Sequence, residues 1–122
     1  MSESKPAFET TAGLVVVNPS GGRSRVTLDP LPFLIGRQAG NHLVLRDNRI
    51  SRCHARIVAD EGGFFVEDLN SRHGVYVNGA KVTRARLANC DRIDFGLAES
   101  YRLVFTLQGD ELHRILGQIQ AP

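Results

Sequence analysis

Short segments that favour β-strands follow one another at close spacing along most of this 122-residue chain. Each segment alternates apolar with polar residues or is rich in β-branched and aromatic residues, as half-buried strands are. The nine segments are 14–17, 25–28, 33–37, 42–45, 54–59, 64–68, 75–79, 91–95 and 101–107. Turn-forming residues such as Gly, Asn, Asp and Pro lie between them. The sequence therefore predicts an all-β protein.

Nine or more strands with short connections require either a closed barrel or two stacked sheets, because one open sheet leaves an apolar face in water. Of these two we expect a sandwich. The length fits one domain, which we place at residues 13–108 after a flexible lead-in at 1–12. We interpret residues 109–122 as a short C-terminal amphipathic helix or the start of a linker. Such a helix would lead to a dimer partner or to an attached effector domain.

Composition narrows the possible partners and location. No apolar run approaches the roughly 20 residues that cross a bilayer, and the start of the chain lacks the order of a secretory signal. The net charge of +2 argues against a broad basic face for nucleic acid. Two cysteines, Cys53 and Cys90, are too few for a disulfide framework. We expect a cytoplasmic protein that binds neither membrane nor nucleic acid.

Residues 48–57, NRISRCHARI, place Ser51, Arg52 and His54 close together and suggest three kinds of site. A catalytic Ser51 would need His54 as an oriented base, but the chain has no GxSxG elbow. A metal site built on Cys53 and His54 lacks the paired spacing of metal ligands. We interpret the cysteines as isolated buried residues and expect no enzyme, no catalytic residue and no metal or other cofactor.

The third kind of site, for an anion, is spread over three segments. Arg37 closes the segment FLIGR, Ser51 and Arg52 follow in the second, and Arg72 and His73 lie in NSRHG. A phosphate group that leaves water needs several charge-assisted donors, which arginine, serine and loop amides supply. Loops at one rim of a rigid sandwich can gather such donors. The residues therefore favour recognition of an anion.

Several motifs appear in a fixed order over about residues 14 to 107. They are Gly36-Arg37, Ser51-x-x-His54, Asp68-Leu69-x-Ser71, Gly74, Asn78-Gly79 and Asp91-x-Ile93. In this order the motifs resemble the forkhead-associated (FHA) domain, a module that binds phosphothreonine peptides. The resemblance implies a sandwich of about eleven strands in two twisted antiparallel or mixed sheets. It also implies a non-enzymatic role in signal transduction, through recognition of phosphorylated protein partners.

The resemblance implies a role for each site residue. Arg37 approaches the phosphate or the adjacent backbone, and Ser51 donates its hydroxyl to a phosphate oxygen. Arg52 contacts the phosphate or the peptide main chain, and Arg72 supplies a further donor. His73 stands where the family commonly has an Asn that reads the peptide backbone. Structural support of the site is assigned to Gly36, His54, Gly74, Asn78 and Gly79.

His54 is implied to tie the loop after Arg37 to the serine loop. Simpler interpretations exist for the donors: Arg37 could be ion-paired, Arg52 and Arg72 could be solvated, and Ser51 could cap its own turn. Where the family has Thr and Gly, this chain has Val75 and Cys90, which we interpret as packing adjustments.

The substitution at His73 supports a second hypothesis, because that position touches the ligand in the family. In this hypothesis the domain is a drifted scaffold that binds a partner or itself independently of phosphorylation.

Overall fold

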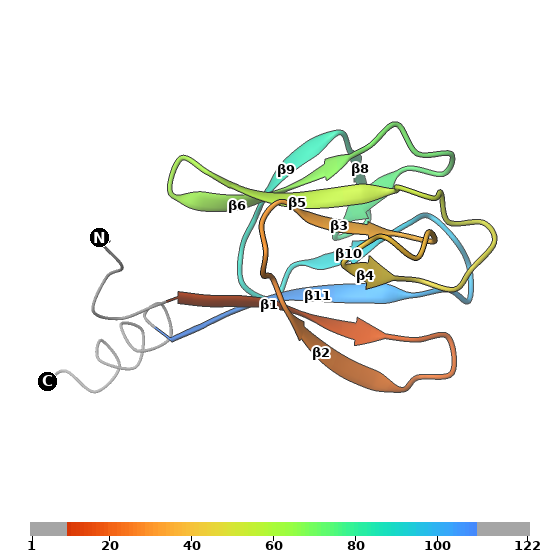
Figure 1. Ribbon diagram of the computed structural model, residues 1–122, viewed down its shortest axis with the longest axis horizontal. Coiled ribbons are helices and arrows are strands. Elements are labelled where there is room, and N and C mark those ends of the chain that lie inside the picture. The colour runs from red at the N-terminus through yellow and green to blue at the C-terminus, as the bar shows by residue number, and fades with distance from the viewer. Residues whose placement is uncertain (1–9, 110–122) are drawn as a thin grey trace, which may run out of the picture.

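The computed structural model describes residues 10–109, which form eleven strands in two stacked sheets (Figure 1). The strands are β1 (Thr10–Val17), β2 (Arg23–Thr27), β3 (Phe33–Gly36), β4 (Leu43–Val44), β5 (Ala55–Asp60), β6 (Gly63–Asp68), β7 (Val75–Val77), β8 (Ala80–Val82), β9 (Arg84–Leu87), β10 (Arg92–Asp94) and β11 (Arg102–Gly109). The predicted all-β sandwich is confirmed. The predicted C-terminal helix lies outside the described residues.

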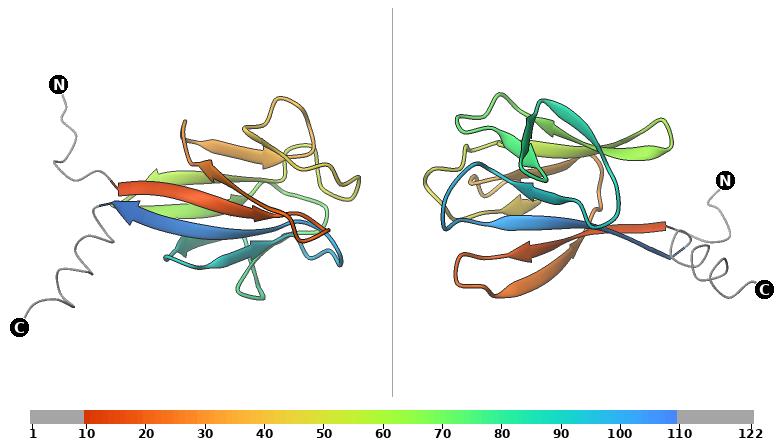
Figure 2. Two further views of the ribbon diagram at one scale, coloured as in Figure 1. Left: turned by 90° about the horizontal axis from the view of Figure 1, so that it is seen from below. Right: turned by 180° about the vertical axis from the view of Figure 1, so that it is seen from behind.

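The two sheets differ in size and contain mostly antiparallel pairs. The order is β2-β1-β11-β10-β7-β8 in the six-stranded sheet and β4-β3-β5-β6-β9 in the five-stranded sheet. Only β3 and β4 pair in parallel among the described strands. β1 and β11 lie side by side in every view (Figures 1 and 2), with Thr10 opposite Gly109. This pair extends slightly beyond the range 13–108.

The core lies between the sheets and follows from the period of two along each strand. Leu14 of β1 faces it from one sheet, together with Phe105 of β11, and Ile57 and Val66 face it from the other. Each fully buried side chain of this size stabilises the fold by about 1.5 to 3 kcal/mol. Val75 is also fully buried, so its interpretation as a packing residue is confirmed.

Two strands were not predicted, and both have little apolar character. β8 is an edge strand with exposed Ala80 and Lys81. β9 reads RARL, with exposed Arg84 and Arg86. The guanidinium of Arg84 lies 4.0 Å from the centre of the Phe65 ring on β6. Contacts with the neighbouring strand hold β9 in the sheet, and a local pattern cannot show them.

The two cysteines do not lie in the core. Both Cys53 and Cys90 are exposed and free, so the prediction of buried cysteines is wrong. Cys90 adopts a φ of +75°, a left-handed conformation that favours glycine. The replacement of the family's glycine by Cys90 therefore affects the conformation of an exposed turn, and its interpretation as a packing adjustment is wrong. Within residues 10–109, no helix is long and apolar enough to cross a membrane.

Candidate functional site

The predicted site residues lie on three loops at one end of the sandwich. These are the β3–β4 loop, the β4–β5 loop and the β6–β7 loop, which gather at the right of Figure 1. Thr10 of β1 and Gly109 of β11 lie at the opposite end. Strands far apart in the sequence thus bring Arg37, Ser51 and Arg72 to one rim.

Backbone hydrogen bonds fix the β3–β4 loop against the β4–β5 loop. The N–H of Arg37 donates to the carbonyl oxygen of Ser51 at 3.1 Å, and Arg37 Nε donates to the carbonyl oxygen of Ile50 at 3.0 Å. Gly36 lies where the two segments cross, because a Cβ there would clash with the carbonyl oxygen of Arg52. This close approach explains why glycine precedes Arg37.

Asn41 secures the same crossing, and the sequence analysis missed it. It is almost fully buried, and its Nδ2 donates to the carbonyl oxygens of Arg52, at 2.7 Å, and Gln38, at 2.9 Å. A buried amide of this kind satisfies backbone carbonyls that the loops leave unpaired. The only local signal was an Asn after Gly40 in a short loop, which is also an ordinary turn signal.

The hydroxyl of Ser51 links the second loop to the third. Ser51 Oγ accepts a hydrogen bond from the backbone N–H of Arg72 at 3.0 Å. This contact spans two loops, so Ser51 does not cap its own turn. A hydroxyl that accepts one bond still has its own proton to donate. Ser51 is half-buried. Its hydroxyl can therefore accept the bond from Arg72 and also donate its own proton to a ligand.

His54 is a fully buried support beneath these loops. Its Nδ1 accepts from the N–H of Ser51 at 3.1 Å, and its Nε2 donates to the carbonyl oxygen of Gly74 at 2.8 Å. The side chain therefore ties the serine loop to the β6–β7 loop, whereas the resemblance implied a link to the loop after Arg37. Burial lowers the pKa of His54, which keeps the imidazole neutral in this arrangement.

The β6–β7 loop is shaped by its own side chains. Asp68 Oδ1 accepts from the N–H of Ser71 at 3.2 Å, and Ser71 Oγ accepts from the N–H of Gly74 at 2.9 Å. Gly74 has a φ of +88°, which favours glycine, and Asn70 also has a positive φ of 57°. The motif from Asp68 to Gly74 thus sets the position of the Arg72 N–H.

Three exposed arginines surround Ser51: Arg37, Arg52 and Arg72. Within residues 10–109, no carboxylate forms an ion pair with any of them, which leaves the ion-paired interpretation of Arg37 without support. The nearby Arg49 differs, since it pairs with Asp47 at 2.9 Å. Hydrogen bonds from Arg49 hold the pKa of the Asp47 carboxyl well below its usual range. The rim is therefore positively charged where its arginines are exposed.

The remaining predicted residues occupy different positions. His73 is exposed in the β6–β7 loop, between Arg72 and Gly74. Asn78 lies in the β7–β8 turn before Gly79. Its Nδ2 donates to Asp91 Oδ1 at 2.9 Å, and its Oδ1 accepts from the N–H of Arg92 at 2.9 Å. These bonds join the turn to the start of β10 and not to the three loops.

The geometry does not form a catalytic pair or a metal centre from the described residues. His54 Nδ1 is bonded to the backbone of Ser51, and Ser51 Oγ is bonded to the backbone of Arg72. A nucleophile would need the hydroxyl itself on the imidazole. Residues 10–109 contain no group of three or more His, Cys, Asp or Glu side chains that could hold a metal ion.

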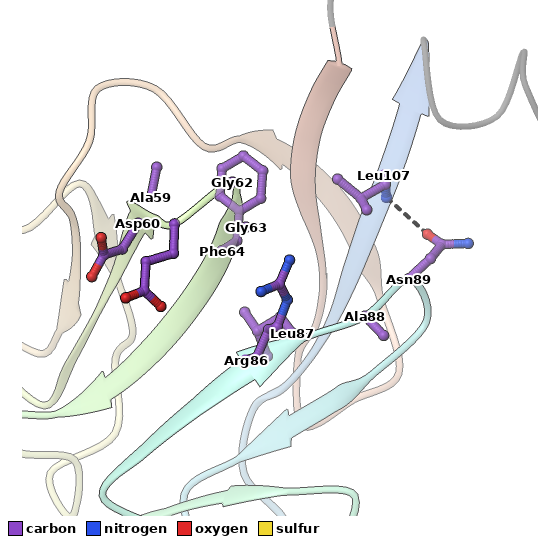
Figure 3. Close-up of a pocket in the computed structure, with 11 residues that line it drawn as sticks. Ala59, Asp60, Gly62, Gly63, Phe64, Arg86, Leu87, Ala88, Asn89 and Leu107 are labelled. Atoms are coloured by element: carbon purple, nitrogen blue, oxygen red, sulfur yellow. Dashed lines mark hydrogen bonds between the residues drawn. The ribbon is translucent and has the colours of Figure 1, made fainter.

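A hollow of about 680 Å³ lies at the far end of the sandwich (Figure 3). It is lined by the β5–β6 turn, including Asp60 and Glu61, by Phe64 and by residues of the β9–β10 region such as Arg86. Two carboxylates at its edge oppose a phosphate dianion through like-charge repulsion. The hollow is therefore a less favourable place for a phosphate than the rim around Ser51, where three arginines are exposed.

A two-sheet sandwich that carries donors for an anion on the loops at one end defines a class of interaction module. Residues 33–96 match the FHA domain family. This chain belongs to that family, whose domains are interaction modules.

Known relatives and structures agree with this assignment. FhaB, an FHA domain-containing protein of Mycobacterium tuberculosis, is 43% identical over 72 residues, which is 59% of this chain and 46% of FhaB. The chain thus spans about half the length of FhaB.

Two solved structures share the fold. One comes from a study of phosphothreonine-dependent FHA domain interactions, with a TM-score of 0.70 and 28% identity over 80% of this chain and 97% of that one. The other is Mycobacterium tuberculosis EmbR in complex with a low-affinity phosphopeptide, with a TM-score of 0.70 and 27% identity over 80% of this chain and 24% of that one.

Proposed function

We propose that this domain recognises phosphothreonine in a protein partner through the rim around Ser51. The observation that carries the proposal is the convergence of Ser51, Arg37 and the Arg72 N–H on one rim, fixed by hydrogen bonds between three loops. A phosphate monoester has a charge of about −1.5 to −2 near neutral pH and strong acceptor oxygens. Preformed donors bind it without a further ordering cost.

Each donor has a distinct part in the proposed complex. The hydroxyl proton of Ser51 bonds a phosphate oxygen, while its Oγ stays bonded to the N–H of Arg72. Arg37 uses Nε on the carbonyl of Ile50, which leaves its terminal nitrogens for the phosphate or the peptide backbone. Arg52 and Arg72 are exposed and add positive charge at the edge. Each charge-assisted hydrogen bond contributes about 1.5 to 3 kcal/mol.

His54, Gly36 and Gly74 hold the donors in place without touching the ligand. His54 bridges the Ser51 N–H and the Gly74 carbonyl, so it links both loops that meet at the Ser51 hydroxyl. Gly36 permits the close crossing that orients Arg37. Asn78 and Gly79 form the β7–β8 turn, and the side-chain bonds of Asn78 go to Asp91 and Arg92 and not to the three loops. The site is thus a set of exposed donors on a buried hydrogen-bonded base.

The two similar solved structures support the proposal. The EmbR structure contains a phosphopeptide, and the other reported structure concerns phosphothreonine-dependent interactions. Threonine adds a methyl group to the phosphate ester, so a reader of this kind is expected to prefer phosphothreonine to phosphoserine.

The test is a binding titration against an oriented phosphothreonine peptide library, with phosphoserine and unphosphorylated libraries as controls. We expect binding to the phosphothreonine library alone or at much higher affinity. An Arg37→Ala variant should lose this binding, and Arg46→Ala, which removes another exposed arginine of the β4–β5 loop, should keep it. Equal binding of all three libraries would overturn the proposal.

His73 favours one alternative function, a scaffold that binds its partner without phosphorylation. The family commonly has Asn at this position. The side-chain amide of Asn carries a hydrogen-bond donor and an acceptor next to each other on a short side chain. A neutral imidazole has one of each on opposite edges of the ring. If the peptide backbone cannot be bound in this way, the same loops would serve a phosphate-independent contact. Binding of an unphosphorylated partner through these loops would support the scaffold.

A further inference from the structure

The outer faces of the two sheets differ in how their arginines are compensated. On the five-stranded sheet, Glu67 accepts from Arg56 at 2.7 Å and from Arg84 at 2.9 Å. Arg84 also donates to Asp60 at 2.9 Å and lies over the ring of Phe65. Cross-strand pairs of opposite charge therefore neutralise most of this face.

Within residues 10–109, the outer face of the six-stranded sheet has no ion pair, although Asp94 of β10 lies opposite Arg102 of β11. Pairing places Arg23 of β2 beside Val17 of β1, and Val17 beside Arg102 of β11. Arg92 of β10 lies beside Val104 in the same way. Because directly paired residues point to the same side, all three exposed arginines share one face. No carboxylate of the described residues forms an ion pair with them.

A groove of about 400 Å³ runs between these arginines. Val15, Val17 and Val104 contribute apolar surface to it, and Arg23, Arg92 and Arg102 line it as well. One acidic residue, Asp94, is also present, and its Oδ1 already accepts from the N–H of Gly96 at 2.9 Å. The groove therefore combines an apolar surface with three positive charges against one negative charge.

We propose that this groove binds an acidic, extended segment of a protein partner. In an extended peptide every second side chain points to the same side, so an alternating acidic segment can direct a whole row of carboxylates at the arginines around the valines. A nucleic acid fits less well, because no aromatic side chain lines the groove for bases to stack on. Arginines that form no ion pair with residues 10–109, set around an apolar surface, are the complement of an acidic segment.

The groove shares no donor with the rim around Ser51, although Asn78 and Gly79 line it, and the proposal does not depend on phosphothreonine binding. The two sites are nevertheless connected through the β10–β11 loop. Ser100 of this loop donates to Asp47 at 2.6 Å, and Arg49 donates to the carbonyl oxygen of Ala98 at 3.2 Å. Arg102 begins β11 directly after this loop. The groove and the rim are thus joined through the hydrogen bonds of one loop.

The experiment is a titration of the whole isotope-labelled chain with a short synthetic peptide of alternating Glu and Val, followed by nuclear magnetic resonance. We expect the amides of Val15, Arg92 and Val104 to shift. An Arg92→Gln/Arg102→Gln variant should bind more weakly, by about two- to five-fold for each arginine. Arg86→Gln removes one positive charge from the other sheet, as each single substitution does in the groove, and should leave the affinity within about two-fold of the parent.

Ser51→Ala should bind the acidic peptide as the parent does, since it alters only the phosphate rim. Two counter-probes are a peptide of alternating Lys and Val and a single-stranded oligothymidine. Three results would overturn the proposal: no shift of the groove amides, equal weakening by Arg86→Gln, or binding of the oligothymidine in place of the acidic peptide. The last result would assign the groove to a nucleic acid.

Discussion

The backbone N–H of Arg72 donates to the side-chain oxygen of Ser51 over 3.0 Å, and this bond joins two loops separated by 21 positions in the sequence. Ser51 is thus held by the β6–β7 loop, while the Arg37 N–H and Nε hold the β4–β5 loop from the other side. The proposed phosphate donors are therefore part of the hydrogen-bond network that shapes the rim. Changes at this rim should affect binding more than folding.

Ser51→Ala removes one donor to the phosphate and one acceptor for the Arg72 N–H. We expect affinity for a phosphothreonine peptide to fall about ten-fold to over a hundred-fold, because a hydrogen bond to a charged group contributes about 1.5 to 3 kcal/mol. The free energy of unfolding should fall by only about 0.5 to 1.5 kcal/mol. Calorimetric titration and chemical denaturation measure the two effects. Ser24→Ala, on exposed β2, is the control, and equal affinities of Ser51→Ala and parent would place the phosphate elsewhere.

His54→Gln should change how stability depends on pH. Burial lowers the pKa of His54 in the folded state below the unfolded value of 6.5, so the unfolded chain binds the proton first as pH falls. The parent's contribution from neutral His54 is complete above pH 6.5 and is lost as pH falls from there through the folded pKa. The variant cannot titrate at this position.

The measurement is the free energy of unfolding of parent and His54→Gln between pH 7 and pH 5. At pH 7 the variant should be less stable by about 1 to 3 kcal/mol, because the Ser51 N–H and the Gly74 carbonyl lose a buried partner. The difference should shrink toward pH 5. His42→Gln, at an exposed histidine that accepts from the N–H of Leu34 at 2.9 Å, controls for loss of a histidine that bonds the backbone outside the core. A difference that stays constant over this range would contradict the role of burial.

His73→Asn separates the phosphothreonine reader from the drifted scaffold. Asn restores the arrangement that the family commonly has, so His73→Asn should keep phosphothreonine binding or tighten it. His73→Ala should lose about 0.5 to 1.5 kcal/mol, the net contribution of one hydrogen bond. Isothermal titration of parent, His73→Asn and His73→Ala with one peptide measures both effects. Failure of all three folded proteins to bind any phosphothreonine peptide would leave the scaffold as the better function.

Cys90→Gly should stabilise the fold. Cys90 holds a φ of +75° in an exposed turn, which costs an L-residue about 1 to 2 kcal/mol. Glycine removes this cost and adds about 0.5 to 1 kcal/mol of lost chain entropy, for a net gain of up to about 1.5 kcal/mol. Chemical denaturation measures it. Cys90→Ala keeps the Cβ and should show no gain, whereas a gain of equal size in Cys90→Ala would attribute the effect to the thiol.

The sequence predicts strands where the signal is local. Residues 14–17 of β1 are Leu followed by three β-branched valines, so the strand is visible in the chain itself, and the structure buries Leu14 and Val16 more than their neighbours Val15 and Val17. β9 lacks such a local signal. Its exposed Arg84 is held instead by Glu67 and Phe65 on β6 and by Asp60 on β5. Such strands are defined by their partners and are missed in a reading of single segments.

The sequence predicts the donors and several supports of the site, including His54, but not every support or the contacts that each one makes. Arg37 and Ser51 appear in ordered motifs, and the structure brings both to one rim. Asn41 was missed because its partner, the Arg52 carbonyl, comes near only when two loops cross. The acceptor for His54 Nε2 is a backbone carbonyl at Gly74, which carries no side-chain signal. The turn geometry at Cys90 is equally absent from composition and periodicity.

The most direct test of phosphothreonine recognition is a nuclear magnetic resonance titration of the labelled chain with one phosphothreonine peptide and its unphosphorylated twin. With the phosphorylated peptide, the amides of Arg37, Ser51 and Arg72 should shift strongly, and the twin should leave them unchanged. Shifts centred on Asp60 and the far hollow of Figure 3, or equal shifts with both peptides, would contradict recognition of phosphothreonine at this rim.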